Sequence, residues 1–315
     1  MRLCRFNHQE TAVVGFYDDD AVTPIAAAAA AYESATSQSL ALSDLDCLVA
    51  ALPHGRSHDS VATLAGWLNG AGADAAALRV PVEDVELLVP IARPNKLFLL
   101  AGNYAKHIEE GGGVAAERAE TFPYVFMKPP TTTLTNPGRP IQIPAVSPDH
   151  VDWELELAIV IGKHAKGVTE SAALDHVAGL TVINDISDRK FRPNPERKER
   201  DKDGFFDWLH GKWHDSFCPC GPCVTTLDEI GDPQSLSMQL TVNGSVKQDA
   251  SSAQMIFPVA AVVEFIASFV TLEPGDIIST GTAAGVGNTT GDYLKAGDRI
   301  EASIEKIGVL RTIVE

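Results

Sequence analysis

Two carboxylates lie two positions apart in an otherwise apolar β-type run, Val-Asp-Trp-Glu-Leu-Glu-Leu-Ala-Ile-Val-Ile-Gly, at residues 151–162. Because successive side chains of a strand point to opposite faces, Glu154 and Glu156 share one face. A solvent-facing edge strand would give the same alternation. From Leu157 to Ile161, however, the run is apolar on both faces, which indicates a strand buried within a sheet. We therefore expect the fold to bury this strand together with its two carboxylates.

Two like charges side by side in an apolar strand are costly unless a cation lies between them. A third carboxylate, Asp185, ends another apolar run at residues 179–185, where a rigid strand would present it to a loop. Together with Glu154 and Glu156 it would form an all-oxygen site, which suits Mg²⁺ first and then Mn²⁺ or Ca²⁺. Three protein ligands leave about half of an octahedron for water or substrate, which is typical of a catalytic site. Taken alone, Asp185 could equally be a turn former.

Length and charge limit the classes of protein to consider. A chain of 315 residues can hold one large domain, or a large domain with a small companion. The net charge of −17 argues against nucleic acid or an anionic membrane as a partner. Residues 1–10 turn polar before an apolar stretch develops, and the apolar run at 257–270 is interrupted by Glu264. We therefore expect a cytoplasmic protein.

Five cysteines, an odd number, fit a reducing compartment. Three of them, Cys218, Cys220 and Cys223, are clustered, so a zinc or redox role is conceivable. A structural zinc would need a fourth ligand, and alternation in an extended segment would send Cys220 and Cys223 to opposite faces. We interpret the cluster as buried thiols outside the site.

The pattern changes near residue 90. Before it come a strand-like run at 12–17, an alanine-rich helix at 25–34 and a helical stretch around 59–69. A proline-punctuated segment, 90–94, then precedes a buried-strand pattern at 96–101. We predict a small N-terminal α/β domain at residues 1–90 and a catalytic domain at residues 91–315.

The second part is rich in short β-runs with glycine and proline turns between them. No G-x-G-x-x-G or Walker-type loop follows any of them. The pattern indicates an α+β, β-rich fold with rolled or barrel-like sheets rather than a doubly wound one. The expected strands are 124–127, 141–143, 153–161, 179–184, 238–242, 277–279 and 299–304, and the chief helices are 170–176 and 258–269.

A histidine and a glutamate precede three consecutive glycines. If residues 102–110 contain a short helix, His107 and Glu110 are i,i+3 neighbours on one face. A carboxylate beside an imidazole sets its tautomer and raises its basicity, which makes a general base for water. Glycines 111–113 would end the helix and act as a hinge for a lid. A surface ion pair is the alternative.

Two further elements could contact an anionic substrate. Lys212, in the strand-like segment 211–217, could stabilise an enolate or carboxylate oxygen. The Gly/Thr loop at 280–287 offers backbone N–H groups and hydroxyls to an anion. Taken separately, a surface lysine and an ordinary turn explain them better.

In this order, the elements resemble the fumarylacetoacetate hydrolase superfamily over roughly residues 95–315. The resemblance implies a mixed β-sandwich roll with a small N-terminal domain, a homodimer, and Mg²⁺ or Mn²⁺ held by Glu154, Glu156 and Asp185. The matching segments are 102–110, 124–129, 152–162, 184–189, 211–222, 255–258, 272–276, 280–287 and 295–298.

The resemblance also implies roles for individual residues. His107 and Glu110 would activate water on the lid. Lys212 would polarise the substrate carbonyl and stabilise the enolate leaving group. Thr282 would hold the substrate carboxylate, and Tyr104, in the first matching segment, would contribute to substrate binding.

The implied reaction is hydrolysis of a C–C bond in a β-diketo, acylpyruvate-like acid, as in aromatic catabolism. Water attacks the distal carbonyl and the enolate of an oxo acid such as pyruvate leaves. The same metal site could instead act as a decarboxylase or isomerase/tautomerase of a 2-oxo diacid such as oxaloacetate. A non-catalytic metal-binding protein is a third alternative, but it would predict a degraded site, and the site residues are all present.

Several positions depart from the family pattern. After Asp185 the family commonly has Ala-Arg-Asp where this chain has Asp188-Arg189-Lys190, and Arg192 stands in place of a glutamine. Because arginine pairs bidentately with carboxylates, we hypothesise that Arg189 and Arg192 bind a second substrate carboxylate. Other departures are Trp213-His214 in place of a small residue and phenylalanine, Ala283 in place of proline, and a longer, charged loop at 193–209.

Overall fold

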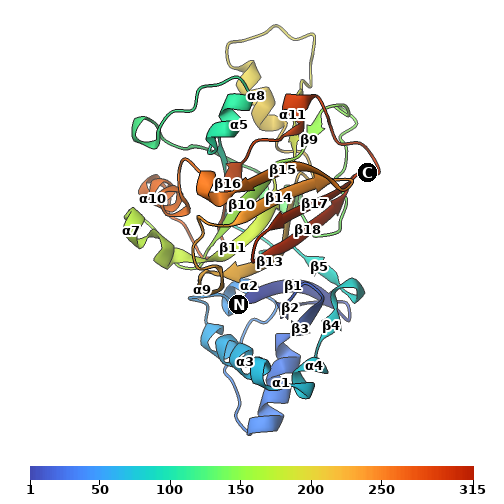
Figure 1. The fold of residues 1–315 in the computed structure, drawn as a ribbon, viewed down its shortest axis with the longest axis vertical. Coiled ribbons are helices and arrows are strands. Elements are labelled where there is room, and N and C mark those ends of the chain that lie inside the picture. Colours follow the sequence, from blue (N-terminus) through green and yellow to red (C-terminus); the bar gives the residue numbers. More distant parts are fainter.

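A computed structural model describes residues 1–315, and a 12-stranded sheet runs through its centre (Figure 1). Its main path is β4-β3-β2-β1-β13-β11-β10-β16-β6-β7, and β5 and β8 pair with β1 and β13 off this path. Most neighbours are antiparallel, but β16 and β6 are parallel. The strands that surround the site are β6 (Leu97–Ala101), β7 (Tyr124–Met127), β10 (Leu155–Ile161), β11 (Val177–Asn184), β13 (Cys218–Thr226) and β16 (Ile277–Thr282).

The acidic apolar run forms the middle of this sheet. All seven residues of β10 are buried, as the apolar pattern on both faces predicts. The run is not continuous, because a two-residue strand, β9 (Val151–Asp152), pairs with β12 (Ser187–Asp188) in a separate small sheet. Between β9 and β10 the backbone leaves the sheet at Trp153 and Glu154, so the two glutamates approach the site from different local backbone conformations.

A second, four-stranded sheet with the order β15-β14-β17-β18 packs against the first and completes a β-sandwich. A large apolar core between the layers includes Leu157, Leu240 and Ala302. The predicted β-rich sandwich is therefore confirmed. The strands of the second sheet are β14 (Ser237–Val242), β15 (Ser245–Ser251), β17 (Arg299–Ile304) and β18 (Gly308–Ile313).

The N-terminal 90 residues extend the central sheet. Strand β1 (Arg2–His8) pairs with β13 at Leu3 and Val224, and helices α1 and α3 cover one side of this end of the sheet (Figure 1). A second apolar core joins Ile25 and Leu64 to Ala158 of β10. The domain boundary near residue 90 stays a prediction. The other elements here are β2 (Thr11–Tyr17), β3 (Ala21–Pro24), α1 (Ile25–Thr36), α2 (Leu48–Ala51), α3 (His58–Gly70), α4 (Ala73–Ala76), β4 (Val80–Pro81) and β5 (Glu86–Leu88).

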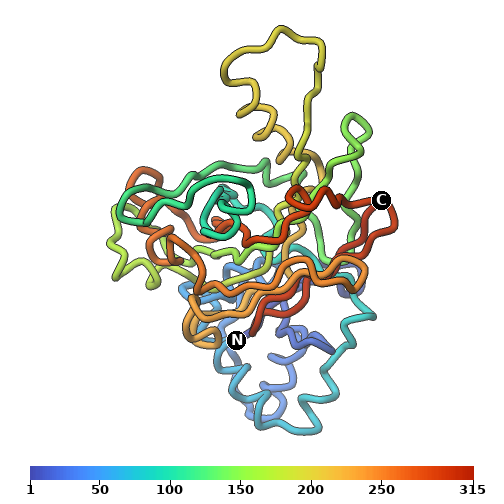
Figure 2. The backbone as a smooth tube through the Cα atoms, turned by 45° about the horizontal axis from the view of Figure 1, so that its top comes forward, coloured from blue at the N-terminus to red at the C-terminus, as the bar shows by residue number.

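Helices beyond residue 90 are short and lie around the sandwich. Helix α10 (Val259–Phe269) confirms the expected helix and packs beside α7 (Glu170–Ala173). The expected strand at 141–143 is reduced to one bridge, between Ile141 and Val314. The charged segment 193–209 is not entirely a loop, because helix α8 begins within it. The part of the segment that precedes α8 projects from the body of the protein (Figure 2). The remaining elements are α5 (Ala105–Glu110), α6 (Pro130–Thr133), β8 (Leu134–Thr135), α8 (Asp203–His210), α9 (Leu227–Ile230) and α11 (Gly287–Thr290).

The cysteine cluster lies in β13 and is free and buried, as expected. Cys218 and Cys220 face the second core, whereas Cys223 faces the core between the two sheets. Burial raises the pKa of the Cys218 thiol to about 12. No helix of the structure combines the length and the apolar character that a membrane crossing requires.

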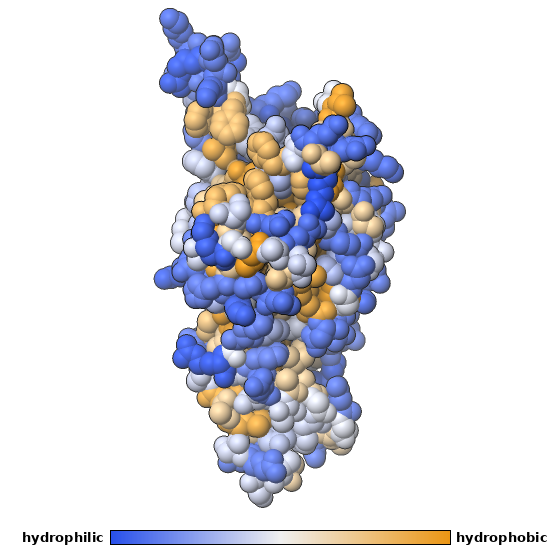
Figure 3. All heavy atoms as spheres, turned by 90° about the vertical axis from the view of Figure 1, so that its left-hand side faces the viewer, coloured by the Kyte–Doolittle hydropathy of each residue, from blue (hydrophilic) through white to orange (hydrophobic).

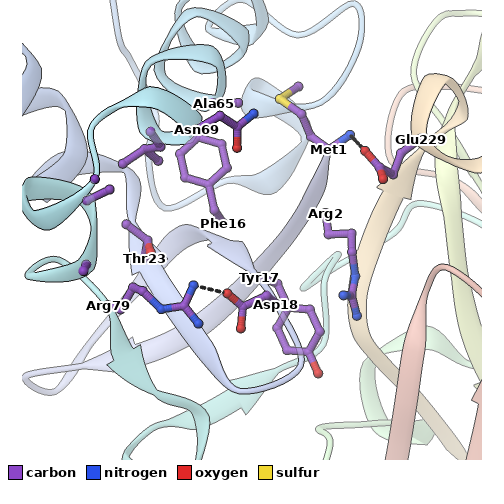
Figure 4. A pocket seen from close by; sticks show the side chains of 14 residues that line it. Met1, Arg2, Phe16, Tyr17, Asp18, Thr23, Ala65, Asn69, Arg79 and Glu229 are labelled. Carbon is purple, nitrogen blue, oxygen red and sulfur yellow. Dashed lines mark hydrogen bonds and ion pairs between the residues drawn. The ribbon is translucent and has the colours of Figure 1, made fainter.

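Two surface hollows lie apart from the carboxylates. One, of about 470 Å³, opens in the N-terminal segment, where Arg79 pairs with Asp18 and the amino group of Met1 with Glu229 (Figure 4). The other, of about 620 Å³, is almost wholly apolar and lies between β7, α8 and α10. Apolar side chains gather on the corresponding side of the molecule (Figure 3).

Candidate active site

Three carboxylates converge where β10 and β11 meet. One oxygen of each of Glu154, Glu156 and Asp185 lies within 4.8 Å of the others, and all three side chains are buried. The backbone N–H of Asp185 donates to the carbonyl of Glu154 at 2.8 Å, which ties the end of β11 to the residue before β10. The structure thus brings together the three residues that we predicted as metal ligands.

Two buried lysines contact this cluster. The Lys212 Nζ donates to Glu154 at 2.8 Å and to Asp185 at 2.6 Å. Lys128, directly after β7, forms an ion pair with Asp185 and donates to the carbonyls of Ile186 and Phe217 at 2.9 and 2.5 Å. Lys128 lies in a segment that matches the family, but it was not among the predicted site residues, because nothing local distinguishes a buried lysine from a surface one.

Arginine 189 links the cluster to a fourth carboxylate. Its Nε lies 2.7 Å from Asp152 and its Nη2 lies 2.6 Å from Glu154. Asp152 also accepts the backbone N–H groups of Gly287 and Asn288, at 2.6 and 2.9 Å. Asp152 therefore joins β9 to the start of α11 and holds Arg189 against the site. Asp152 was not among the predicted site residues, although it lies two residues before the first predicted ligand.

Burial and charge act in opposite directions on these groups. Burial raises the pKa of Glu156 well above its usual range, and the charges of Asp185 and Glu154 raise it further. Burial also opposes ionisation of Glu154, but Lys212 and Arg189 outweigh it and lower the pKa of Glu154 well below its usual range. The Lys212 pKa is raised, because Asp185 and Glu154 outweigh its desolvation.

The donor set fits a divalent metal. One oxygen of Glu156 accepts the N–H of Gly281 at 2.9 Å, whereas its Oε1 is buried and has no hydrogen-bond partner. A buried carboxylate oxygen without a partner is costly, and a cation beside it would remove that cost. Because all the candidate ligand atoms are carboxylate oxygens, the cluster suits a hard cation.

The expected short helix is α5, and it carries both members of the proposed base. His107 Nδ1 lies 2.8 Å from Glu110 Oε1, and Glu110 Oε2 accepts the N–H of Gly285 at 2.9 Å. The side chains of both residues are about one fifth exposed, so the pair is only partly accessible to water. The N–H of Gly285 thus ties Glu110 to the Gly/Thr segment that also contacts Glu156 through Gly281.

Three expected substrate-binding residues are already engaged elsewhere. The Thr282 hydroxyl donates to the Leu155 carbonyl at 2.9 Å and accepts from Gln248 at 2.8 Å, so it holds the sheet together beside Glu156. Tyr104 is buried in the core with its hydroxyl 3.5 Å from the Met238 sulfur. Arg192 is 43% exposed and pairs with Glu199 at 2.8 Å, so in this structure it does not join Arg189. Local sequence could not show these competing partners.

The β-sandwich fold and the buried cluster of carboxylates and lysines are features that known protein families can be compared with. The family model for the C-terminal domain of fumarylacetoacetate (FAA) hydrolase matches residues 96–315. The chain therefore belongs to the fumarylacetoacetate hydrolase family. Relatives and structural neighbours in this family include hydrolases, isomerases and tautomerases, so the chain is an enzyme of this group.

Two curated relatives share 39% identity with this chain. One is a 2,4-didehydro-3-deoxy-L-rhamnonate hydrolase of a Sphingomonas strain, aligned over 244 residues, or 76% of this chain and 80% of that protein. The other is a mitochondrial oxaloacetate tautomerase of Xenopus laevis, aligned over 230 residues, or 72% of this chain and 67% of that protein.

Solved structures match over the whole length. The maleylpyruvate hydrolase of Sphingobium sp. SYK-6 superposes with a TM-score of 0.71 at 29% identity, covering 100% of this chain and 99% of that one. A fumarylacetoacetate hydrolase from Exiguobacterium antarcticum gives a TM-score of 0.75 at 28% identity, with the same coverage of both chains.

Proposed function

We propose that this protein is a divalent-metal-dependent hydrolase that cleaves a C–C bond in a β-diketo, acylpyruvate-like acid. The observation that carries the proposal is the His107–Glu110 pair, 2.8 Å apart. Glu110 is held by the N–H of Gly285, in the same Gly/Thr segment whose Gly281 N–H contacts Glu156 of the buried carboxylate cluster. Decarboxylation needs an electron sink and tautomerisation needs a base for a C–H proton, whereas hydrolysis needs a base that activates water. The hydrolases among the relatives and structural neighbours support this choice.

Glu154, Glu156 and Asp185 would hold Mg²⁺ or Mn²⁺. The bound cation would act as a Lewis acid on the 2-oxo group and as a template for the substrate. In the structure Lys212 neutralises Glu154 and Asp185 directly. Once a divalent cation shares that charge, the ammonium of Lys212 is free to donate to a substrate oxygen as negative charge develops there.

The protein side chains account for the proton transfers. Glu110 holds His107 at Nδ1, so the other ring nitrogen, Nε2, can take a proton from water. The oxygen of that water forms a bond to the distal carbonyl carbon. The C–C bond then breaks, and its electron pair passes to the enolate, which Lys212 stabilises. Protonation of the enolate carbon completes the oxo-acid product.

A second candidate is tautomerisation or decarboxylation of a 2-oxo diacid such as oxaloacetate. The tautomerases among the curated relatives favour it. Such a reaction would use Lys212, together with a cation held by the carboxylate cluster, as the electron sink. It would place no demand on His107 to activate water, although tautomerisation would still need a base for the C–H proton.

One substrate panel distinguishes the two candidates. Acylpyruvates, oxaloacetate and other 2-oxo diacids are assayed with Mg²⁺ or Mn²⁺, and again after complete chelation. We expect acylpyruvate cleavage that chelation abolishes and that His107→Gln lowers about 10²- to 10⁴-fold, the usual contribution of a general base. Cleavage that persists without metal would contradict the metal mechanism. Turnover of oxaloacetate alone, without C–C cleavage of any acylpyruvate, would favour the second candidate.

A further inference from the structure

Two of the positions that depart from the family pattern contact each other in the folded protein. Asp188 stands where alanine is common, and His214 stands where phenylalanine is common. The Asp188 Oδ2 and the His214 Nε2 lie 3.4 Å apart. An acid and an imidazole thus face each other at two positions that depart from the family pattern.

The two facing atoms have no other partner. The Asp188 side chain is completely buried, and neither Asp188 Oδ2 nor His214 Nε2 has a hydrogen-bond partner. The other Asp188 oxygen accepts the N–H of Lys190 at 3.1 Å. The His214 ring packs edge-on between Phe191 and Phe217, with both centroids 4.9 Å away. These aromatic contacts hold the imidazole in place against the carboxylate.

The pair lies at the junction of two segments that carry site residues. The Asp188 N–H donates to the Gly211 carbonyl at 2.9 Å, directly before Lys212. The backbones are so close that a Cβ on Gly211 would lie 2.4 Å from the Asp188 carbonyl oxygen. On the other side, Asp188 precedes Arg189, which contacts Asp152 and Glu154. A shift of this junction would therefore move Lys212 and Arg189 together.

We propose that Asp188 and His214 form a positioning pair that holds the Lys212 turn against the carboxylate cluster. The inference rests on the proposed function in assigning Lys212 to substrate. Removing one member leaves the other buried and unpaired, whereas replacing both with apolar residues removes the polar contact without leaving a buried group unsatisfied. The pair should therefore behave as a coupled unit and not as two independent side chains.

A double-mutant cycle tests the coupling. Asp188→Ala and His214→Phe are made singly and together, since the double variant restores the residues that are common in the family. His210→Phe is the matched control, because His210 lies on the same segment, stacks on Trp213 and contacts no carboxylate. We expect each single variant to lower kcat at least tenfold with little change in KM, and the double variant to stay within about threefold of wild type.

A binding measurement makes the test independent of turnover. Calorimetric titration of the Mg²⁺-loaded protein with oxalate, a planar dianion that mimics the enolate of a 2-oxo acid, reports contact with Lys212. We expect at least tenfold weaker binding in each single variant, recovery in the double variant and no change in His210→Phe. If wild type turns over no compound of the substrate panel, the proposed function fails while the oxalate cycle still decides the role of the pair.

Other outcomes would overturn the proposal. Additive losses of kcat in the cycle would show that the two residues act independently. A rise in KM with unchanged kcat would show that Lys212 keeps its position. If a single variant does not fold, Asp188→Asn replaces it, because the amide keeps the shape and an acceptor oxygen for the imidazole N–H. Asp188→Asn should stay within about threefold of wild type in oxalate affinity, and a tenfold loss in that folded variant would contradict positioning through this contact.

Discussion

At the scale of single residues, Glu156 shows the strongest conflict between burial and charge. Its side chain is completely buried, one of its oxygens has no hydrogen-bond partner, and its pKa is raised by burial and by neighbouring Asp185 and Glu154. Such a group is stable when it is protonated or when it binds a cation. Metal binding should therefore be accompanied by the loss of a proton from this site.

Substitution of Glu156 tests the ligand assignment. Glu156→Ala should reduce Mg²⁺ or Mn²⁺ affinity at least a hundredfold and abolish turnover, while the far-ultraviolet circular dichroism spectrum is retained. Calorimetric titration with Mn²⁺ measures the loss. Unchanged metal affinity would rule out Glu156 as a ligand.

The raised pKa of Glu156 also predicts a pH dependence of stability. A carboxyl whose pKa is raised on folding stabilises the folded state below its unfolded pKa, and this contribution is lost as the pH rises through the folded pKa. The Tm of metal-free wild type should therefore fall over that range relative to Glu156→Gln, whose neutral side chain does not titrate. Parallel Tm curves of the two proteins would contradict the raised pKa.

Substitution of Arg192, in contrast to Glu156, should have only a small effect on activity. It is exposed and pairs with Glu199 on the projecting segment. In this conformation Arg192→Gln should change kcat/KM by no more than about threefold for both mono- and dicarboxylate 2-oxo acids, since exposed ion pairs contribute about 0–1 kcal/mol. A selective loss on dicarboxylates would show that the segment moves Arg192 into the site.

At the scale of elements, β16 approaches the site with little room for side chains. Gly281 has a φ of +86°, and a Cβ there would lie 3.1 Å from the Cβ of Asn103. Its N–H also holds the Glu156 carboxylate at 2.9 Å. Backbone conformation and close packing therefore both require glycine at this position.

Gly281→Ala should lower the free energy of unfolding by about 1–3 kcal/mol, through the strained φ and the close contact. Gly138→Ala is the control, because its φ is +80° but nothing lies within 4 Å of the added Cβ. Chemical denaturation should show a larger loss for Gly281→Ala than for Gly138→Ala. Equal losses of unfolding free energy would mean that the close contact with Asn103 relaxes without destabilising the protein.

At the scale of the whole molecule, the N-terminal segment shares a sheet with the catalytic part. Strand β1 covers the edge of β13, and residues from both parts meet in the second apolar core. We therefore expect that the two parts on either side of the predicted boundary near residue 90 do not fold independently. Residues 91–315 expressed alone should aggregate or melt at a lower temperature than the full chain, because an open edge strand and apolar surface are exposed. An unchanged Tm would support an independent catalytic domain.

The homodimer implied by the family resemblance also stays a prediction at this scale. The chain has a mass of 33.6 kDa, so light scattering on the eluting protein should give about twice that value. A monomeric mass at micromolar concentration would contradict it.

Much of the site could be predicted because its spacing is local. Backbone geometry decides which residues of a short helix share a face, and it brings His107 and Glu110 together on α5. Glu154 and Glu156 were expected to converge by strand alternation, and they do converge, although Glu154 lies in the break before β10. Asp185 was singled out by its place at the end of a strand-like run, and Lys212 by its strand-like segment. The family resemblance then joined both to one site, which no local rule could do. The β-rich sandwich followed from the density of short apolar runs and from the same resemblance.

Only the tertiary structure decided which other charges reach the carboxylates. Lys128 and Asp152 enter the site, whereas Arg192 and the hydroxyl of Tyr104 have partners elsewhere. The physical reason is that a lysine or arginine is buried only where long-range strand pairing brings a carboxylate to it. Sequence therefore determined the strand, its acidic face and the candidate base, and the order of strands in the sheet determined the set of charges around them.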